Sequence, residues 1–245
     1  MTEIAGQHAV VTGGAKGIGR AIADALAERG AHVTVMSRTA TQHELPYARL
    51  DVDVTDETAV AEAFDAARES GGPITILVNN SGIAESAPFV RTSAQMWDRT
   101  IATNLTGTFL SARAALPDMI AAKRGRIVNI ASLAGLYGLP YVSAYSASKH
   151  GVLGLTRALA AELADSGVTV NAVCPGYTES EMLQRAIKNV AAKTGKKTAE
   201  ARAQLAAMNP GGRIVDAQEV ADVVIELCES DLNGKEIILP RVAND

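Results

Sequence analysis

The stretch HAVVTGGAKGIGR (His8 to Arg20) joins a short apolar run to a glycine-rich turn and then to a helical pattern. We predict a strand at His8 to Thr12 and a helix at Ile18 to Arg29. In the turn between them, Gly13, Gly17 and Gly19 have the spacing GxxxGxG. Glycines let the backbone turn sharply and approach a ligand, and the helix start offers N–H groups to a pyrophosphate. The spacing differs from the usual GxGxxG of dinucleotide sites, so a plain tight turn stays an alternative.

Six further β-rich runs follow this first one along the chain. They are Val-, Ile- and Leu-rich without clean alternation, as expected for parallel strands that are covered on both faces. We predict strands at His32 to Ser37, Ala48 to Val52, Ile74 to Asn80, Gly125 to Ser132, Val168 to Cys174 and Lys235 to Pro240.

Helical patterns separate most of these runs, at Glu57 to Glu69, Gln95 to Ala122, Ala144 to Ala164 and Ala217 to Cys228. Strand–helix–strand repetition implies right-handed crossovers and a parallel sheet. We therefore predict an α/β fold: a Rossmann-like, doubly wound, seven-stranded parallel sheet with helices on both faces.

Two segments depart from the simple alternation. SRTATQHELPY, residues 37–47, leaves little room for a crossover helix. Residues 179–213 form a long excursion, which we interpret as two helices joined at Gly195 that make a lid over the substrate. No internal repeat or linker composition divides the chain, so we predict one domain over residues 1–245.

The composition excludes several classes of protein. Apolar residues at 47% and charged residues at 20% are ordinary globular values. The net charge of −4 and pI near 5.6 provide no broad basic field, which argues against nucleic acid as a partner.

The sequence also carries expectations about location and metals. We find no signal peptide at the start and no apolar run of about 18 residues that would span a membrane, so we expect a cytoplasmic protein with no membrane partner. Cys174 and Cys228 are far apart and are expected to be free thiols. The histidines and cysteines have no metal-ligand spacing, so no metal site is predicted.

The end of the second predicted strand bears on the choice of cofactor. NAD-binding folds place an acidic residue there, whereas an arginine accommodates the 2′-phosphate of NADP. Here the residues are Ser37 and Arg38, and Lys16 lies in the glycine-rich turn. We favour NADP(H), with NAD(H) possible; the alternative is that Arg38 and Lys16 are ordinary solvated side chains.

A phenol and an amine stand four residues apart in AYSASKHG, at Tyr145 and Lys149. On a helix these positions share a face, with Cβ atoms about 5–6 Å apart. A nearby ammonium favours the phenolate of a tyrosine, which would lower the pKa of Tyr145. From the two residues alone, a Tyr/Lys pair on a solvated helix face is an equally good interpretation.

The motifs together resemble the short-chain dehydrogenase/reductase family, over about residues 6–240. TGGAKGIG, NNSG (Asn79 to Gly82), IATNLTG, NIAS, YSASK and NAVCPGYTESEM occur in that family's order and spacing. The segment from YSASK to NAVCPG looks most like 3-oxoacyl-thioester and polyketide ketoreductases.

The resemblance implies four catalytic residues. Tyr145 would be the general acid in ketone reduction, and Lys149 would lower its pKa and hold the nicotinamide ribose. Ser132 would hydrogen-bond the carbonyl oxygen on which charge develops. Asn104 would hold a water that links Lys149 to solvent. The dinucleotide itself supplies the hydride.

The resemblance also implies the binding residues. Asp53 and Val54 would border the adenine, Asn80 and Gly82 the adenosine ribose, and Pro175, Gly176 and Thr178 the nicotinamide. With these, the expected cofactor contacts are Gly13, Lys16, Gly17, Ile18, Gly19, Ser37, Arg38, Asp53, Val54, Asn80, Gly82, Tyr145, Lys149, Pro175, Gly176 and Thr178. Tyr137 and Tyr177 are the candidates for substrate contact.

The resemblance favours an NADPH-dependent reductase of a small ketone or, most of all, a 3-oxoacyl thioester. Some reductases of acyl-carrier-protein substrates use two basic residues to dock the carrier. Here Lys123 falls near one such position, but Ser166 occupies the other, which favours a coenzyme A (CoA) thioester. The alternatives are a secondary-alcohol or cyclic-diol dehydrogenase and, outside enzymes, an NADP(H)-sensing protein. The long helical patterns at Gln95 to Ala122 and Ala144 to Ala164 resemble the interface of family homotetramers; a homodimer is the other expectation.

Overall fold

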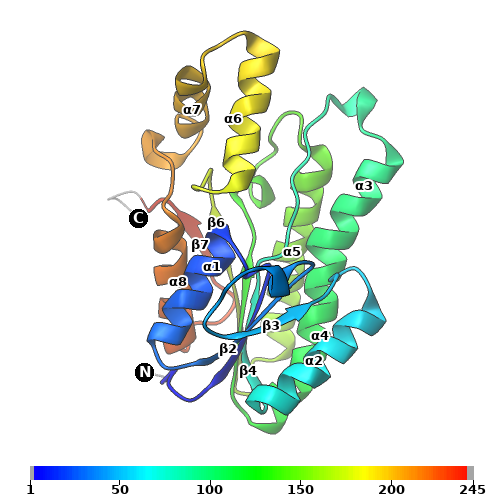
Figure 1. Cartoon of the computed structure of the whole chain (residues 1–245), viewed down its shortest axis with the longest axis vertical. Helices are drawn as coiled ribbons and strands as arrows, with labels where there is room; N and C mark the ends of the chain where they lie inside the picture. Colours follow the sequence, from blue (N-terminus) through cyan, green and yellow to red (C-terminus); the bar gives the residue numbers. More distant parts are fainter. Residues whose placement is uncertain (1–2, 242–245) are drawn as a thin grey trace.

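The computed structural model describes residues 3–241 and contains one seven-stranded sheet (Figure 1). All of its strands are parallel, in the order β3-β2-β1-β4-β5-β6-β7. The strands are β1 (His8–Thr12), β2 (His32–Ser37), β3 (Ala48–Asp51), β4 (Ile74–Asn79), β5 (Gly125–Ile130), β6 (Val168–Pro175) and β7 (Glu236–Leu239). The predicted α/β fold with its seven parallel strands is confirmed.

Helices cover both faces of this sheet. The α-helices of the described residues are α1 (Gly17–Glu28), α2 (Glu57–Gly71), α3 (Ala94–Ile101), α4 (Gly107–Ala121), α5 (Ser143–Glu162), α6 (Glu181–Thr194), α7 (Thr198–Ala206) and α8 (Ala217–Glu229). Helices α1 and α8 pack on one face, and α2, α4 and α5 pack on the other.

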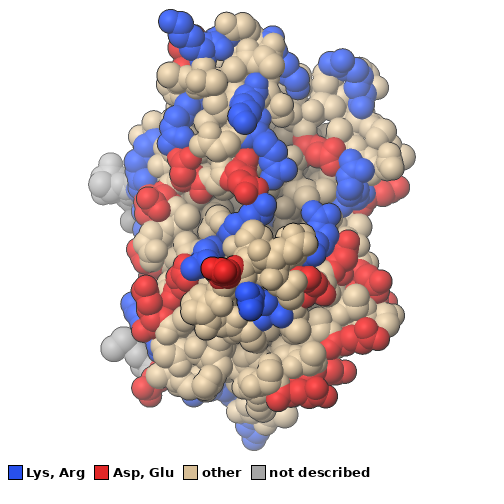
Figure 2. Space-filling view, in the orientation of Figure 1, with Lys and Arg blue, Asp and Glu red and all other residues tan. Residues whose placement is uncertain are grey.

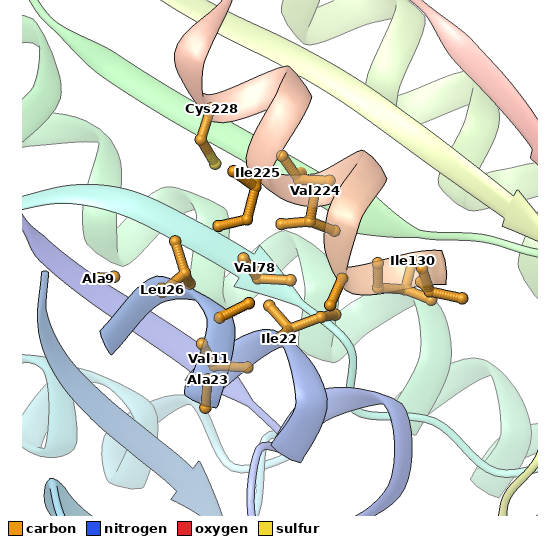
Figure 3. Close-up of a cluster of buried hydrophobic side chains, with 14 of the residues drawn as sticks. Ala9, Val11, Ile22, Ala23, Leu26, Val78, Ile130, Val224, Ile225 and Cys228 are labelled. Carbon is orange, nitrogen blue, oxygen red and sulfur yellow. The ribbon is translucent and has the colours of Figure 1, made fainter. Parts of the chain in front are cut away.

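Two hydrophobic cores follow from the pleat of the strands. Ala9 and Val11 of β1 point toward α1 and α8, where they meet Leu26 and Ile225 (Figure 3). Val10, between them in sequence, points to the other core. Successive side chains of a strand alternate between faces, so a strand that is buried on both faces must be apolar throughout.

The connection between β2 and β3 contains no α-helix. Only a short 3₁₀ turn, Ala40–Gln42, interrupts it, as the polar, proline-containing sequence predicts. The two-helix interpretation of the α6–α7 segment (residues 179–213) is also confirmed. Gly195 ends α6 with φ 71°, a left-handed conformation that glycine adopts without strain.

The helix predicted over Gln95 to Ala122 is helical throughout, but it is not one regular α-helix. The structure has α3, then a π-helical turn at Ala102–Thr106, then α4. A π-helical turn holds one residue more than an α-helical turn. The sequence pattern does not reveal it, because the turns on either side keep the apolar residues of an ordinary α-helix. π-turns are frequent at functional sites, and this one contains Asn104.

The carboxyl ends of the parallel strands share one edge of the sheet. The chain passes from β1 to β2 on one side, whereas β4 pairs with β1 on the other. Ligands of open α/β sheets bind at such a switch point, outside the carboxyl ends. Within residues 3–241, no helix has the length and apolar character needed to cross a bilayer.

Candidate active site

The glycine-rich turn after β1 has the shape of a phosphate cradle. Gly13 and Gly17 have φ values of 63° and 58°. A Cβ on Gly19 would lie 2.4 Å from both the Gly13 carbonyl oxygen and the Asn80 side-chain nitrogen. The turn therefore requires glycine at these positions for its backbone conformation and its packing.

The main-chain N–H groups at the start of α1 have no side-chain cap. Its N-cap residue, Lys16, makes no side-chain capping bond, and no acidic residue lies in the first turn. Main-chain N–H groups at a helix start that lack a cap are suited to an anion. Ile18 lies in this turn and packs on the adjoining core. The turn thus fits the pyrophosphate of a dinucleotide.

Asn80 braces the turn from β4. Its Nδ2 donates to the carbonyl oxygens of Thr12 and Gly13, each at 3.1 Å. In return, the Thr12 hydroxyl accepts from the main-chain N–H groups of Asn80 and Ser81. The Nδ2 of Asn80 is therefore engaged by the protein backbone and supports the cradle. The predicted contact of Asn80 with the adenosine ribose stays a prediction.

Of the two cations predicted to bind a 2′-phosphate, one has no ion-pair partner in the described residues and the other has one. Arg38, just after β2, is exposed and forms no ion pair within residues 3–241. Lys16 instead forms a 2.7 Å ion pair with Glu181, at the start of α6. Ser37 is partly buried, and its hydroxyl accepts from the Thr39 N–H at 3.4 Å.

The predicted adenine contacts follow β3. Asp53 is exposed, and its carboxylate accepts from the Thr55 N–H and hydroxyl. Val54 is buried against α4, where a Cβ on Gly107 would lie 2.7 Å from its side chain. Asp53 is accessible to a ligand, whereas the side chain of Val54 belongs to the packing.

Tyr145 and Lys149 lie on one face of the first turns of α5. The Lys149 Nζ is 5.8 Å from the centre of the Tyr145 ring. Lys149 is buried, and its Nζ donates a 2.7 Å hydrogen bond to the Ile130 carbonyl oxygen at the end of β5. The solvated alternative for this pair is thereby excluded.

The expected lowering of the pKa of Tyr145 is wrong for this structure. Burial raises the pKa of Tyr145, while a hydrogen bond with Ser132 acts in the opposite direction. Burial also lowers the pKa of Lys149 to about 8. In both residues the largest cause of the shift is desolvation, which disfavours the charged form.

Ser132 lies two residues after the end of β5 and is close to Tyr145. It begins a 3₁₀ turn, Leu133–Gly135, and its hydroxyl accepts from the Ala134 N–H at 3.1 Å. The hydroxyl proton remains for another acceptor, and Tyr145 lies within hydrogen-bonding reach. The sheet and α5 therefore bring a serine hydroxyl and a phenol together at one point.

Asn104 is fully buried in the π-turn. Its Oδ1 accepts from the Ile83 N–H, and its Nδ2 donates to the Ile83 carbonyl and to the Ser148 hydroxyl. The Ser148 hydroxyl in turn donates to the Tyr145 carbonyl oxygen at 2.7 Å. Asn104 thus links the loop after β4 to the turn of α5 that carries Tyr145.

Gly82 lies close to Asn104 and Lys149. A Cβ at Gly82 would be 3.4 Å from Asn104 Oδ1 and 3.7 Å from Lys149 Nζ. Gly82 therefore lies beside Lys149, and its contact with the adenosine ribose stays a prediction. The loop after β4 crosses the end of the sheet, which residue order alone does not fix.

The segment after β6 is clamped from the far end of the α6–α7 segment. Asn209 Oδ1 accepts from the Tyr177 N–H at 2.7 Å, and its Nδ2 donates to the Tyr177 carbonyl. A Cβ at Gly176 would lie 2.2 Å from Asn209 Oδ1. Pro175 and Thr178 are buried on either side. The predicted nicotinamide-bordering turn is therefore held rigidly beside the site.

The two tyrosines proposed to meet substrate are placed differently. Tyr177 is half-buried and close enough to Tyr145 to raise its pKa electrostatically. Tyr137 is 57% exposed, beyond the 3₁₀ turn that follows Ser132. Tyr177 therefore lies beside Tyr145, whereas the side chain of Tyr137 is largely exposed to solvent.

Sequence reasoning missed three residues that shape this site. They are Ser148, Glu181 and Asn209. Ser148 stands within YSASK, where its hydroxyl signals a polar contact, but the partner on another element is not visible. Nothing near Glu181 or Asn209 in sequence marks them, because their partners are 165 and 32 residues away.

The chain is similar to known oxidoreductases. A family model described as short chain dehydrogenase matches residues 7–191. The cis-4-hydroxycyclohexanecarboxylate dehydrogenase of Sinomonas cyclohexanicum is 40% identical, over 88% of this chain and 86% of its own. The 3-oxoacyl-acyl-carrier-protein reductase FabG of Vibrio cholerae serotype O1 is 35% identical, over 92% and 91%.

A solved structure has the same architecture. An actinorhodin polyketide ketoreductase variant with NADPH superposes with a TM-score of 0.90, covering 97% of each chain at 33% identity. The arrangement of the sheet and its covering helices is therefore shared along nearly the whole chain.

Proposed function

The chain belongs to the short-chain dehydrogenase family of oxidoreductases, and on that premise we propose that it is an NADPH-dependent carbonyl reductase of 3-oxoacyl thioesters. One observation carries this proposal. Ser132, Tyr145 and Lys149 meet at the carboxyl edge of the sheet, beside a turn that fits a pyrophosphate.

The protonation of Tyr145 supports the reductive direction. Because its pKa is raised, the phenol keeps its proton at neutral pH and can donate it to a carbonyl oxygen. The Ser132 hydroxyl would hydrogen-bond the same oxygen as negative charge develops there. A bound dinucleotide would supply the hydride, so that the carbonyl gains a hydride at carbon and a proton at oxygen.

Lys149 and Asn104 would restore and orient the proton donor. Lys149 has one N–H engaged with Ile130, which fixes its side chain and leaves its other donors for the cofactor ribose and Tyr145. With a pKa of about 8, Lys149 can pass a proton near neutral pH. Asn104, through Ser148, would hold the Tyr145 turn in place.

We propose NADPH as the cofactor because Arg38 stands free at the end of β2, with no carboxylate at that position. An arginine there can pair with a 2′-phosphate, whereas an acidic residue would repel it. The solved ketoreductase relative contains NADPH, which agrees with this choice.

We propose CoA as the carrier rather than a carrier protein. Lys123 and Ser166, at the positions that resemble carrier-docking residues, lie before β5 and β6. Within one chain, both residues lie at the end of the sheet opposite Tyr145. Only Lys123 of the two is basic. A relative is named as a carrier-protein reductase, so an assay must compare both substrates.

The decisive assay follows the absorbance of NADPH at 340 nm with acetoacetyl-CoA. We expect NADPH consumption and a 3-hydroxy product. The proposal fails if NADPH absorbance stays constant while secondary alcohols reduce NADP⁺. The same assay with acetoacetyl carrier protein decides the carrier: a higher kcat/KM with the carrier protein than with CoA rejects CoA as the substrate carrier.

A second candidate function has a specific observation in its favour. A 40% identical relative is named as a dehydrogenase of a ring-borne secondary alcohol. A secondary-alcohol or cyclic-diol dehydrogenase would use Tyr145 as a base, and its raised pKa would confine that reaction to alkaline pH. Oxidation of cis-4-hydroxycyclohexanecarboxylate at alkaline pH, with a kcat/KM above that of thioester reduction at neutral pH, would favour this candidate.

We also propose a single cytoplasmic domain in which the α6–α7 segment serves as the substrate lid and α4 mediates homotetramer contacts. Phe109 and Ile120 of α4 are both exposed, and their spacing places them on one helix face. Light scattering tests the assembly: we expect Phe109→Glu to lower the mass from that of four chains, whereas a wild-type monomer would contradict the proposal.

A further inference from the structure

The α6–α7 segment carries a charge opposite to that of the whole chain. Residues 179–213 contain seven lysines and arginines against three glutamates, whereas the whole chain has a net charge of −4. Figure 2 shows blue side chains gathered over the part of this face where Figure 1 places α6 and α7. Such a local excess attracts anions even on an acidic protein.

The three glutamates of the segment are already engaged. Glu179 pairs with Arg202, and Glu181 pairs with Lys16 of the glycine-rich turn. Glu200 accepts from the Lys197 N–H at the start of α7. None of them forms an ion pair with the remaining side-chain cations of α6 or of the turn after it, within residues 3–241.

Five cations are left without a carboxylate partner in the described chain: Arg185, Lys188, Lys193, Lys196 and Lys197. Lys188 and Lys193 are exposed, and Leu183 and Ile187 form the buried side of the same helix. The cations therefore face solvent from α6 and from the turn between α6 and α7. Unpaired ammonium groups are point charges that bind phosphate readily.

The segment begins at the reacting centre and extends away from it. Tyr177 is close to Tyr145, and Ser180 Cβ lies 3.8 Å from where a Cβ of Gly17 would be. From there α6 runs 14 residues, or about 21 Å, to the top of the view in Figure 1. A ligand that starts at Tyr145 and follows α6 passes its cations in order.

The reach of a CoA thioester matches the place of those cations. Its pantetheine arm is about as long as four extended residues, or roughly 15 Å from the sulfur to the first phosphorus. Along the axis of α6, Lys188 lies about 10 Å beyond Glu181, and Lys193 about 18 Å. An arm of this length that starts beside the first turn of α6 would place the phosphates between these two lysines.

We propose that Lys188 and Lys193, with the neighbouring cations of the segment, bind the phosphates of a CoA thioester substrate. This inference rests on the proposed thioester reductase function and assigns the part of the chain that recognises the carrier. Its energetic basis is electrostatic: single exposed ion pairs contribute little, but several cations around one multiply charged group act together and are screened by salt.

The experiment compares two thioesters that share the reacting group. Acetoacetyl-CoA carries the phosphates, whereas acetoacetyl-N-acetylcysteamine ends before them. In the double variant Lys188→Glu and Lys193→Glu, we expect the KM for acetoacetyl-CoA to rise about tenfold while kcat changes little. The KM for the short thioester should stay unchanged. Added salt should raise the wild-type KM for acetoacetyl-CoA but not that of the variant.

A matched control uses two lysines outside the segment, Lys123 and Lys235. Both are exposed, and neither forms an ion pair in residues 3–241. Lys123→Glu with Lys235→Glu changes the net charge by the same amount, and we expect the KM for acetoacetyl-CoA to stay near the wild-type value. A rise equal to that of the segment variant would mean that the net charge of the protein, not this surface, attracts CoA.

Other outcomes overturn the inference separately from the function. Equal losses on both thioesters would mean that the substitutions merely disturb the segment. An unchanged KM for acetoacetyl-CoA in the double variant would also reject the inference, and so would an effect seen only with a carrier-protein thioester. In both cases the proposed reductase function would stand, because the thioester is still reduced. If neither thioester were reduced by the wild-type protein, the proposed function itself would fail, and this inference with it.

Discussion

The buried Nζ of Lys149 lies 2.7 Å from the carbonyl oxygen of Ile130, so the amine that faces the phenol of Tyr145 is anchored to the sheet. The anchor holds Lys149 in a dry site, where burial lowers its pKa to about 8. Burial makes the charged form of Lys149 unfavourable. Ionisable groups with such perturbed pKa values are frequent at functional sites.

Replacing Lys149 by methionine should change how stability depends on pH. The folded chain releases this proton near pH 8, but the unfolded chain keeps it to about pH 10.4. Between those values the unfolded state holds more protons, so rising pH favours folding. From pH 7 to 9.5, we expect wild type to gain about 2 kcal/mol relative to Lys149→Met in urea unfolding. The exposed control Lys235→Met should show a constant difference, and a constant difference for Lys149→Met would refute the assignment.

Replacing Tyr145 by phenylalanine should remove the proton donor and leave the fold intact. We expect kcat for acetoacetyl-CoA to fall about 10²–10⁴-fold, because positioned acid catalysis contributes that much. NADPH binding, followed by the fluorescence of the cofactor, should be retained. Tyr141→Phe, at a nearby exposed tyrosine, is the control and should keep wild-type kcat. Comparable losses in both variants would contradict the role of Tyr145.

Replacing Arg38 by aspartate should reverse the cofactor preference. The free guanidinium at the end of β2 would become a carboxylate, which repels a 2′-phosphate and can accept from a ribose hydroxyl. We expect the KM for NADPH to rise at least tenfold and the KM for NADH to fall. Steady-state kinetics with both cofactors measures this, and an unaltered KM for NADPH would show that Arg38 is only a solvated side chain.

Replacing Gly19 by alanine should damage the cofactor cradle. The new Cβ would lie 2.4 Å from the Gly13 carbonyl and from Asn80 Nδ2, so the turn must open. We expect the affinity for NADPH, measured by calorimetry, to fall more than tenfold. Gly138→Ala is the matched control, since nothing lies within 4 Å of its added Cβ. Unchanged NADPH affinity in Gly19→Ala would mean that the turn does not hold the cofactor.

Replacing Asn209 by alanine should release the turn after β6. Two hydrogen bonds to the Tyr177 backbone and one to the Arg213 carbonyl would be lost from a buried site. We expect the free energy of unfolding to fall by about 1–3 kcal/mol and the KM for NADPH to rise. Asn189→Ala, on the exposed side of α6, should change neither. A stability loss with an unchanged KM would reduce Asn209 to a purely structural role.

Much of this molecule could be predicted from local patterns. The apolar runs at His8 to Thr12 and Val168 to Cys174 predict strands within a residue or two of their bounds, because strands buried on both faces must be apolar throughout. Gly195 predicts the break between α6 and α7, since a left-handed residue ends a helix. These signals act over a few residues and survive in any tertiary setting.

The rest depended on contacts between distant residues. The π-turn around Asn104 lies within a continuous helical pattern, and it is set by hydrogen bonds to Ile83 and Ser148. Lys16 forms its ion pair with Glu181, and the sequence of the glycine-rich turn does not predict this partner.

By itself, the sequence determined the order of strands and helices and the identity of the phenol, amine and hydroxyl groups, because propensity and periodicity are local properties. Only the tertiary structure decided that Tyr145 has a raised pKa, that Asn80 braces the cradle and that Gly82 lies beside Lys149. Burial and long-range hydrogen bonds set these features, and both arise only when the sheet and its covering helices are assembled.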